Sequence, residues 1–194
     1  MLRHRGSGLA WIVSLCLLTL ATASALLRLM GRPWWCQGGE PWLWSGEVGS
    51  MHNSQHLFDP YALTHLIHGV ALYALLAMVA GRLPVATRFL AALVLEAAWE
   101  IFENTDLVIE RYRAVTMARG YYGDSIGNVL GDVAACMVGF VGAARLPVWG
   151  TVVAVVALEA VLAWWIRDGL VLNVLMLLHP VDAIRQWQAA GGGA

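Results

Sequence analysis

Five long apolar stretches recur along this sequence of 194 residues, in which 59% of the residues are hydrophobic and 13% are charged. A helix needs roughly 20 residues to cross a hydrocarbon core of about 30 Å. An ordinary soluble domain of this size is less apolar than this chain, whose mean hydropathy is +0.65. The stretches predict an all-α, polytopic membrane bundle of five transmembrane helices. They occupy residues 9–29, 61–80, 88–105, 122–143 and 148–166.

A sixth apolar stretch, residues 170–178, is too short to span a bilayer. We interpret it as an interfacial or re-entrant piece within a C-terminal interfacial segment, residues 170–188. Gly and Pro mark the ends of the longer stretches, as in the GRLP turn at 81–84. The prediction is therefore a single membrane domain over residues 1–194.

The charge balance argues against a nucleic-acid partner, since the formal net charge is -1 and no basic face is clustered. The three cysteines, Cys16, Cys36 and Cys136, form neither a CxxC pair nor an even set in the loops. No disulfide framework is predicted from them. The N-terminal MLRHR and the apolar run after it have the outline of a signal peptide. Because the run continues through Leu27, an uncleaved first helix is favoured.

Arginine counts on the two sides of the predicted spans do not by themselves fix the orientation. The turns at 81–84 and 145–147 are short and free of acids, and a first helix with a basic leader often dominates insertion. These features favour a cytoplasmic N-terminus in a bacterial inner (cytoplasmic) membrane. The longer connections, 32–60 and 106–121, would then face the periplasm.

The predicted periplasmic loop, residues 32–60, combines four tryptophans with a dense group of polar residues. Tryptophan is favoured at headgroup depth, so an aromatic belt explains the tryptophans. It explains less well the polar group just before the second span, which we interpret as the rim or lid of a site. That group contains His52, Asn53, Gln55, His56 and Asp59.

Charged side chains recur inside the predicted spans. Inserting one at the centre of a membrane helix costs about 2.5–3.5 kcal/mol, so each is expected to have a polar partner or a functional role. In the second span, His65 and His68 are three residues apart and share a helix face. The third span carries an acidic stripe. The fourth repeats polar residues every four positions, each preceded by a glycine that would let a neighbouring helix approach closely. These residues are Glu96, Glu100 and Glu103, then Asp124, Asn128 and Asp132 after Gly123, Gly127 and Gly131, with a lone Glu159 in the fifth span.

The helical rise of 1.5 Å per residue converts these positions into depths below the outer interface. Four helices are then expected to converge on one polar pocket, with a main layer roughly 10 Å deep. A shallower layer would lie nearer water and a deeper one nearer the bilayer middle. The main layer contains His68, Glu100, Asn128 and Glu159, the shallower layer His65, Glu103 and Asp124, and the deeper layer Glu96 and Asp132.

Two imidazoles beside several carboxylates offer the ligand types of a divalent metal site. The same groups can act as general acids and bases without metal, or can simply hydrogen-bond one another to lock the bundle. The candidate catalytic residues are His65, His68, Glu100, Glu103 and Asp124, of which all but Asp124 are candidate metal ligands. Candidate structural or supporting residues are Glu96, Asn128, Asp132, Glu159, His52, His56 and Asp59.

Arginines follow the third span, in the segment DLVIERYRAVTMARGYY. The guanidinium group fits phosphate in a bidentate way, so Arg111, Arg113 and Arg119 are candidate contacts for a lipid headgroup. The alternative is ordinary interfacial pairing with Asp106 and Glu110.

Several long motifs resemble one known family. The runs HNSQHLFDPYALTHLIHG, LEAAWEIFENTDLVIERYR, YYGDSIGNVLGD and IRDGLVLNVLMLLHPVDAIRQWQ are similar to the bacterial membrane family called domain of unknown function 2585. The similarity runs from about residue 31 to 188 and implies no activity. A fainter resemblance, carried by the acidic third span and by Asp124, Asn128 and Gly131, is to the VanZ-like membrane proteins. The HxxH helix and the Trp-rich loop depart from the VanZ-like pattern.

The VanZ-like resemblance implies chemistry on envelope lipids or cell-wall precursors. The functional hypothesis is an inner-membrane protein whose His/Glu/Asp site binds or processes a phosphorylated envelope lipid or lipid-linked precursor. Membrane lipids would then be its partners, and a divalent metal its possible cofactor. The alternative is a non-enzymatic accessory subunit or assembly factor that binds another membrane protein.

Overall fold

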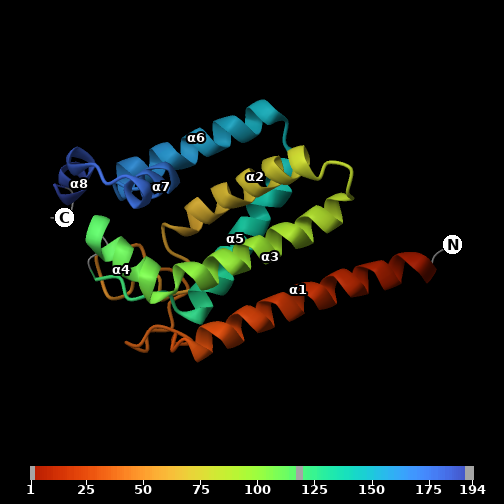
Figure 1. The fold of residues 1–194 in the computed structure, drawn as a ribbon, viewed down its shortest axis with the longest axis horizontal. Coiled ribbons are helices and arrows are strands. Elements are labelled where there is room, and N and C mark those ends of the chain that lie inside the picture. The colour runs from red at the N-terminus through yellow and green to blue at the C-terminus, as the bar shows by residue number, and fades with distance from the viewer. Residues whose placement is uncertain (1–2, 117–119, 191–194) are drawn as a thin grey trace.

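The computed structural model describes residues 3–116 and 120–190, which fold into eight α-helices (Figure 1). This confirms the all-helical class. The helices are α1 (Arg3–Leu29), α2 (Ala62–Val79), α3 (Val85–Glu103), α4 (Asp106–Val115), α5 (Ile126–Arg145), α6 (Val148–Trp165), α7 (Leu170–Leu178) and α8 (Asp182–Ala189).

Four helices are long and apolar enough to cross a membrane, namely α1, α2, α5 and α6. They indicate a membrane protein. The predicted count of five spans is not confirmed, because α3 does not reach the same apolar standard. That helix has 19 residues, enough for a span, but four of them are charged: Arg88, Glu96, Glu100 and Glu103. A crossing by α3 stays a prediction that depends on these charges having partners.

Local backbone chemistry explains two helix boundaries that the apolar pattern misplaced. The fourth predicted span begins at residue 126, not 122, because Gly123 has a positive φ of 96° and Ser125 caps α5. The Ser125 hydroxyl accepts the Asn128 N–H at 3.0 Å, as a helix N-cap does. The third predicted span ends at Glu103, after which the chain turns at Thr105 and begins the short helix α4.

Close packing of α2 against α5 forms the centre of the bundle. A Cβ atom at Gly69 would overlap the Cys136 carbonyl, and one at Gly139 would overlap the Leu66 carbonyl. These glycines therefore let the two backbones approach, as small residues do in membrane helices. The predicted glycine run behaves differently: a Cβ at Gly131 would meet the Leu57 carbonyl, so loop 32–60, not a neighbouring helix, fills that space.

One end of the bundle carries most of the irregular structure (Figure 1). The start of α2, the end of α3 and the start of α5 lie there, together with loop 32–60 and the short helices α4, α7 and α8. Leu170 N–H donates to Glu159 of α6 at 3.0 Å, so the chain turns back toward α6 as α7 begins. The polar residues of three helices are thereby covered by short elements at this end.

Candidate functional site

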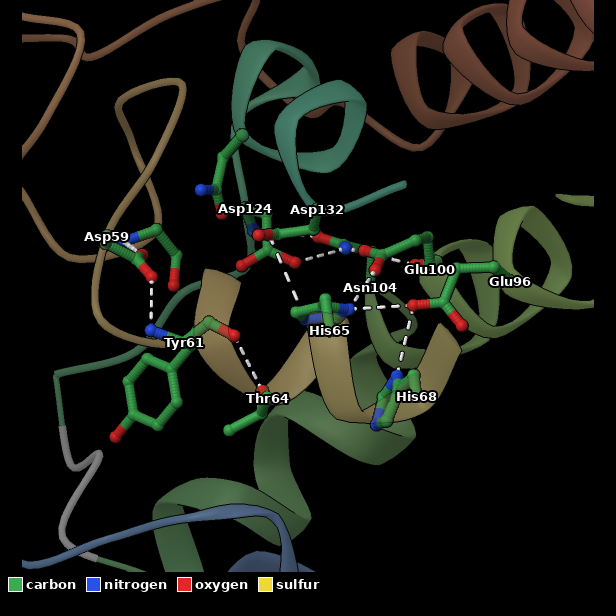
Figure 2. Close-up of polar contacts among 12 residues, drawn as sticks. Asp59, Tyr61, Thr64, His65, His68, Glu96, Glu100, Asn104, Asp124 and Asp132 are labelled. Atoms are coloured by element: carbon green, nitrogen blue, oxygen red, sulfur yellow. Dashed lines mark hydrogen bonds and ion pairs between the residues drawn. The ribbon is translucent and has the colours of Figure 1, made fainter. Parts of the chain in front are cut away.

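Two histidines on the first turns of α2 share one carboxylate of α3 (Figure 2). The Nδ1 atoms of His65 and His68 lie 2.8 and 3.0 Å from the same oxygen, Oε1 of Glu96. The two imidazole rings are 4.8 Å apart between centroids and meet edge to face. Glu96 therefore fixes the orientation of both rings and leaves their Nε2 atoms for other partners.

More carboxylates surround His65. Its Nδ1 lies 3.2 Å from Oε1 of Glu100, and its Nε2 lies 3.9 Å from Oδ2 of Asp132. Glu100 and Asp132 are 1% and 3% exposed. Among the described residues, Oδ1 of Asp132 makes no hydrogen bond, and Oε1 of Glu100 makes none apart from its 3.2 Å ion-pair contact with His65. Buried oxygens without a hydrogen bond are costly in a protein interior, which makes these atoms candidates for contact with a ligand or ion.

A second hydrogen-bonded group lies toward the end of the bundle and centres on Asp124. Asn104 donates to its carboxylate at 2.6 Å and accepts its backbone N–H at 2.8 Å, while the Tyr121 hydroxyl donates at 2.9 Å. Glu103 pairs with the Tyr112 hydroxyl. Asn104 is fully buried and was missed by the sequence analysis, although it stands one residue after the acidic stripe.

A cavity of about 430 Å³ opens beside these groups. It is bounded by α2, α3, α4, α5 and α7 and by the segments that precede α2, α5 and α7. Its lining combines polar and apolar side chains. The polar ones include His65, His68, Glu96, Glu103, Asp124 and Asp132, and the apolar ones include Leu72, Leu95, Trp99, Leu170, Val174 and Leu177.

Tyr61 and Asp168 complete the cavity wall where α2 meets the turn before α7. The Tyr61 hydroxyl donates to Asp168 at 3.0 Å, and the Gly169 N–H donates to it at 2.9 Å. Burial raises the pKa of the Asp168 carboxyl from 3.8 to about 6, although these hydrogen bonds lower it. The sequence analysis did not select either residue, because they are 107 positions apart.

The structure brings most of the predicted site residues to one place and shifts the role of one. Glu96, expected to support the site from a deeper layer, contacts both histidines directly. The Asn128 amide nitrogen is buried beside the site and makes no hydrogen bond among the described residues. Glu159 does not line the cavity and instead accepts the Leu170 N–H.

Three predicted rim residues of loop 32–60 have other neighbours. Asp59 accepts the N–H groups of Ser54 and Tyr61 at 2.9 and 2.8 Å, so it holds the loop at the entry to α2. Burial raises the pKa of its carboxyl from 3.8 to about 6. His52 and His56 do not line the cavity and contact each other at 3.3 Å.

The arginines predicted to grip a headgroup make contacts with backbone carbonyls. Arg111 donates to the Leu177 carbonyl from Nε and Nη2, at 3.1 and 2.7 Å. Arg113 donates to the Tyr121 carbonyl. Neither side chain lines the cavity, and Arg119 lies outside the described residues. Headgroup binding by Arg111 and Arg113 stays a prediction.

Two overlapping groups of donor atoms could hold a metal ion in the cavity wall: His65, His68 and Glu96, and His65, Glu100 and Glu103. In each group the donor atoms lie within 4.8 Å of one another. A tetrahedral zinc site with bonds of about 2.0–2.2 Å separates its ligand atoms by about 3.4 Å. The 2.8 and 3.0 Å contacts of Glu96 would therefore open by a few tenths of an ångström around an ion.

Fold and site together define a helical membrane protein with a buried His/Glu/Asp cavity at one end of its bundle. The chain belongs to the family described as Protein of unknown function (DUF2585), whose model matches residues 27–190. This confirms the family that the sequence motifs resemble.

Close relatives share nearly the whole chain. A UPF0314 protein of Paracoccus denitrificans (strain Pd 1222) is 51% identical over 173 residues, which cover 89% of this chain and 90% of the relative. The UPF0314 protein R03235 of Rhizobium meliloti (strain 1021) is 48% identical, with 92% and 90% covered. A UPF0314 protein of Sphingopyxis alaskensis is 44% identical, with 93% and 95% covered. The VanZ-like resemblance is not shown by these comparisons, and no solved structure gives a significant match.

Proposed function

We propose that this protein binds, and acts on, the polar head of a phosphorylated lipid of the bacterial inner membrane, through a divalent cation held by His65, His68 and Glu96. The observation that carries the proposal is the mixed lining of the cavity, in which three ligating side chains are accompanied by apolar side chains of α2, α3 and α7. An amphiphile fits such a space because its chain can contact the apolar side chains while its head meets the polar ones.

The charge of the cavity wall argues for a cation. Glu96, Glu103, Asp124, Asp132 and Asp168 line it, whereas no arginine side chain does among the described residues. A phosphate group entering alone would meet carboxylates without a compensating charge. A divalent ion would offset the acids and bridge them to phosphate oxygens, as Mg²⁺ and Mn²⁺ do in phosphate sites.

The polar side chains of the cavity also offer acid–base groups. With the ion bound by His65, His68 and Glu96, the carboxyl groups of Glu103 and Asp124 remain in the lining, where they accept hydrogen bonds from the Tyr112 and Tyr121 hydroxyls. A carboxyl group held in this way can take or give a proton at the head of a bound amphiphile. The reaction depends on which lipid head is bound. The polar side chains of the cavity support acid–base catalysis on a phosphate ester.

Binding of Mn²⁺ to the detergent-purified protein tests the proposal. Electron paramagnetic resonance measures the concentration of free Mn²⁺ and so gives the affinity of the protein for this ion. The affinity should be at least tenfold lower in the His68→Ala and Glu96→Gln variants. Dodecyl phosphate should tighten Mn²⁺ binding in the wild type, whereas dodecanol should not, because only the phosphate bridges the ion. The exposed Glu47 gives a matched control, Glu47→Gln.

Equal Mn²⁺ affinity in the wild type and both variants would contradict the proposal. Absence of Mn²⁺ binding, with or without dodecyl phosphate, would contradict it as well. The polar groups would then be a hydrogen-bond network that stabilises the helical bundle. Purification of the chain with a stoichiometric protein partner and no retained lipid would favour the accessory-subunit alternative instead.

A further inference from the structure

A second group of metal-ligating side chains lies outside the cavity, in the loop between α1 and α2. We define the loop cluster as Cys36, Glu40, His52 and His56. The Sγ atom of Cys36 lies 3.4 Å from Nδ1 of His52, which in turn lies 3.3 Å from Nε2 of His56. Cys36 and His56 are buried, at 5% and 0% exposure.

Glu40 places a fourth donor beside Cys36 and His52. Its Oε2 atom lies 3.6 Å from Sγ of Cys36 and 4.0 Å from Nδ1 of His52. Tetrahedral zinc bonds of about 2.0–2.3 Å put neighbouring ligand atoms about 3.3–3.8 Å apart. The separations of 3.3, 3.4 and 3.6 Å match edges of such a tetrahedron, whereas Glu40 would move closer to His52, now 4.0 Å away, to complete it.

The surroundings of the loop cluster orient its ligands. The Trp42 carbonyl lies 2.7 Å from Nδ1 of His56, so Nδ1–H donates to it and Nε2 presents its lone pair to the cluster. Metal-bound histidines are held by this kind of contact on their second nitrogen. Trp42 also stacks on His56, and the edge of Trp35 meets the same ring, which makes the shell apolar.

We propose that Cys36, Glu40, His52 and His56 form a zinc site. A thiolate, two imidazoles and a carboxylate are the ligand types that Zn²⁺ takes in a tetrahedral arrangement. The sequence carries part of this signal, since His52 and His56 have the H-x₃-H spacing of zinc sites. Cys36 stands 16 positions before His52, so the spacing alone does not connect them.

The position of the site gives it a structural role at the rim of the cavity. Between the two histidines, Asn53 and Ser54 line the cavity, and Gln55 donates to the Gly123 carbonyl at 2.9 Å. Ser125 N–H donates to the Ser54 carbonyl at 2.9 Å. A zinc ion that clamps His52 and His56 would hold this segment against the start of α5.

Cobalt substitution tests the zinc site, because a thiolate bound to Co²⁺ gives a sulfur-to-metal charge-transfer band that His and Glu ligands do not give. We expect Co²⁺ added to the reduced, detergent-purified chain to produce this band and Zn²⁺ to abolish it. Cys36→Ser should remove the band. Cys16→Ser is the matched control and should keep it, since Cys16 lies in α1.

The variant His68→Ala separates this inference from the proposed function. It should lose Mn²⁺ affinity in the cavity and keep the cobalt–thiolate band, whereas Cys36→Ser should do the reverse. If Cys36→Ser fails to fold, His52→Gln removes the most exposed imidazole of the cluster and should weaken Co²⁺ binding at least tenfold at unchanged helix content. A wild-type chain without the band, or a band that survives Cys36→Ser, would overturn the zinc site.

Discussion

Asn104 connects the end of α3 to the segment before α5 through two hydrogen bonds, and a third binds its side chain back to α3. Its amide donates to the Glu100 carbonyl and to Asp124, and its carbonyl accepts the Asp124 N–H. Asn104→Ala would leave the buried Asp124 groups without these partners. We expect the free energy of unfolding to fall by about 2 kcal/mol, a typical cost of orphaning buried polar groups.

Thermal unfolding in detergent micelles measures this loss. Gln186→Ala is a suitable control, because Gln186 is exposed on α8 and should tolerate alanine with little change. Equal stability of the two variants would contradict the assigned role of Asn104.

Asp168 predicts a pH dependence whose sign follows from its burial. Its pKa is about 6 in the folded protein against an ordinary 3.8, so the folded state holds the proton more tightly than the unfolded chain. The stability contributed by this carboxyl is therefore complete below about pH 4 and is lost as the pH rises through about 6. The difference corresponds to roughly 3 kcal/mol.

In Asp168→Asn this part of the pH dependence should disappear. Relative to the wild type, the variant should gain up to roughly 3 kcal/mol between pH 4 and pH 7, measured by unfolding at several pH values. The exposed Asp182 supplies the control, Asp182→Asn, which should follow the wild-type profile. A constant difference between Asp168→Asn and the wild type at all pH values would refute the prediction.

The sequence predicted which polar residues lie close together better than it predicted their depths. With the observed helix starts and ends, His65 and Glu100 both lie three residues inside the end of the bundle, and His68 and Glu96 lie six and seven residues inside. At 1.5 Å per residue each pair is level, which explains their contacts. The predicted layers were offset because the third span was taken to end at residue 105, two positions beyond the helix.

At the scale of elements, the crossing of α2 and α5 depends on glycine. Gly139→Ala would push a methyl group into the Leu66 carbonyl and force the two helices apart. We expect a loss of about 2 kcal/mol in the free energy of unfolding, within the usual cost of overpacking. Unfolding in micelles measures it, and Mn²⁺ affinity should also fall because α2 carries both histidines.

The neighbouring Gly142 provides the matched control within the same helix. A Cβ atom there meets nothing within 4 Å, so Gly142→Ala should be neutral or stabilise by up to about 1 kcal/mol through helix propensity. Equal destabilisation by both substitutions would show that the loss reflects α5 itself and not its crossing with α2.

Long apolar helices were predictable from the sequence, whereas the short elements around the site were not. Periodicity and Pro or Gly at the turns place α2 and α6 within a residue or two of their observed bounds. Helix α4 was missed because it has only ten residues and four of them are charged: Asp106, Glu110, Arg111 and Arg113. Such a helix is stabilised by its contacts with the rest of the fold, which the local sequence does not show.

In the whole molecule, α2, α3 and α5 converge at one end of the bundle. Short helices and a long loop cover the polar residues there, so buried carboxylates and imidazoles face a cavity and not the lipid. Segments far apart in sequence build its wall, as the Tyr61–Asp168 hydrogen bond shows. This convergence could be predicted from helix faces, but the cavity depends on α7 turning back toward α6.

The most direct test is pulsed electron paramagnetic resonance of Mn²⁺ bound to protein that carries ¹⁵N-labelled histidine. We expect ¹⁵N couplings from two imidazoles in the wild type, and from one in His68→Ala measured at saturating Mn²⁺. The couplings should be unchanged in Cys36→Ser, whose substitution lies outside the cavity. A bound Mn²⁺ that shows no histidine coupling, or couplings that survive the loss of both His65 and His68, would contradict the central claim.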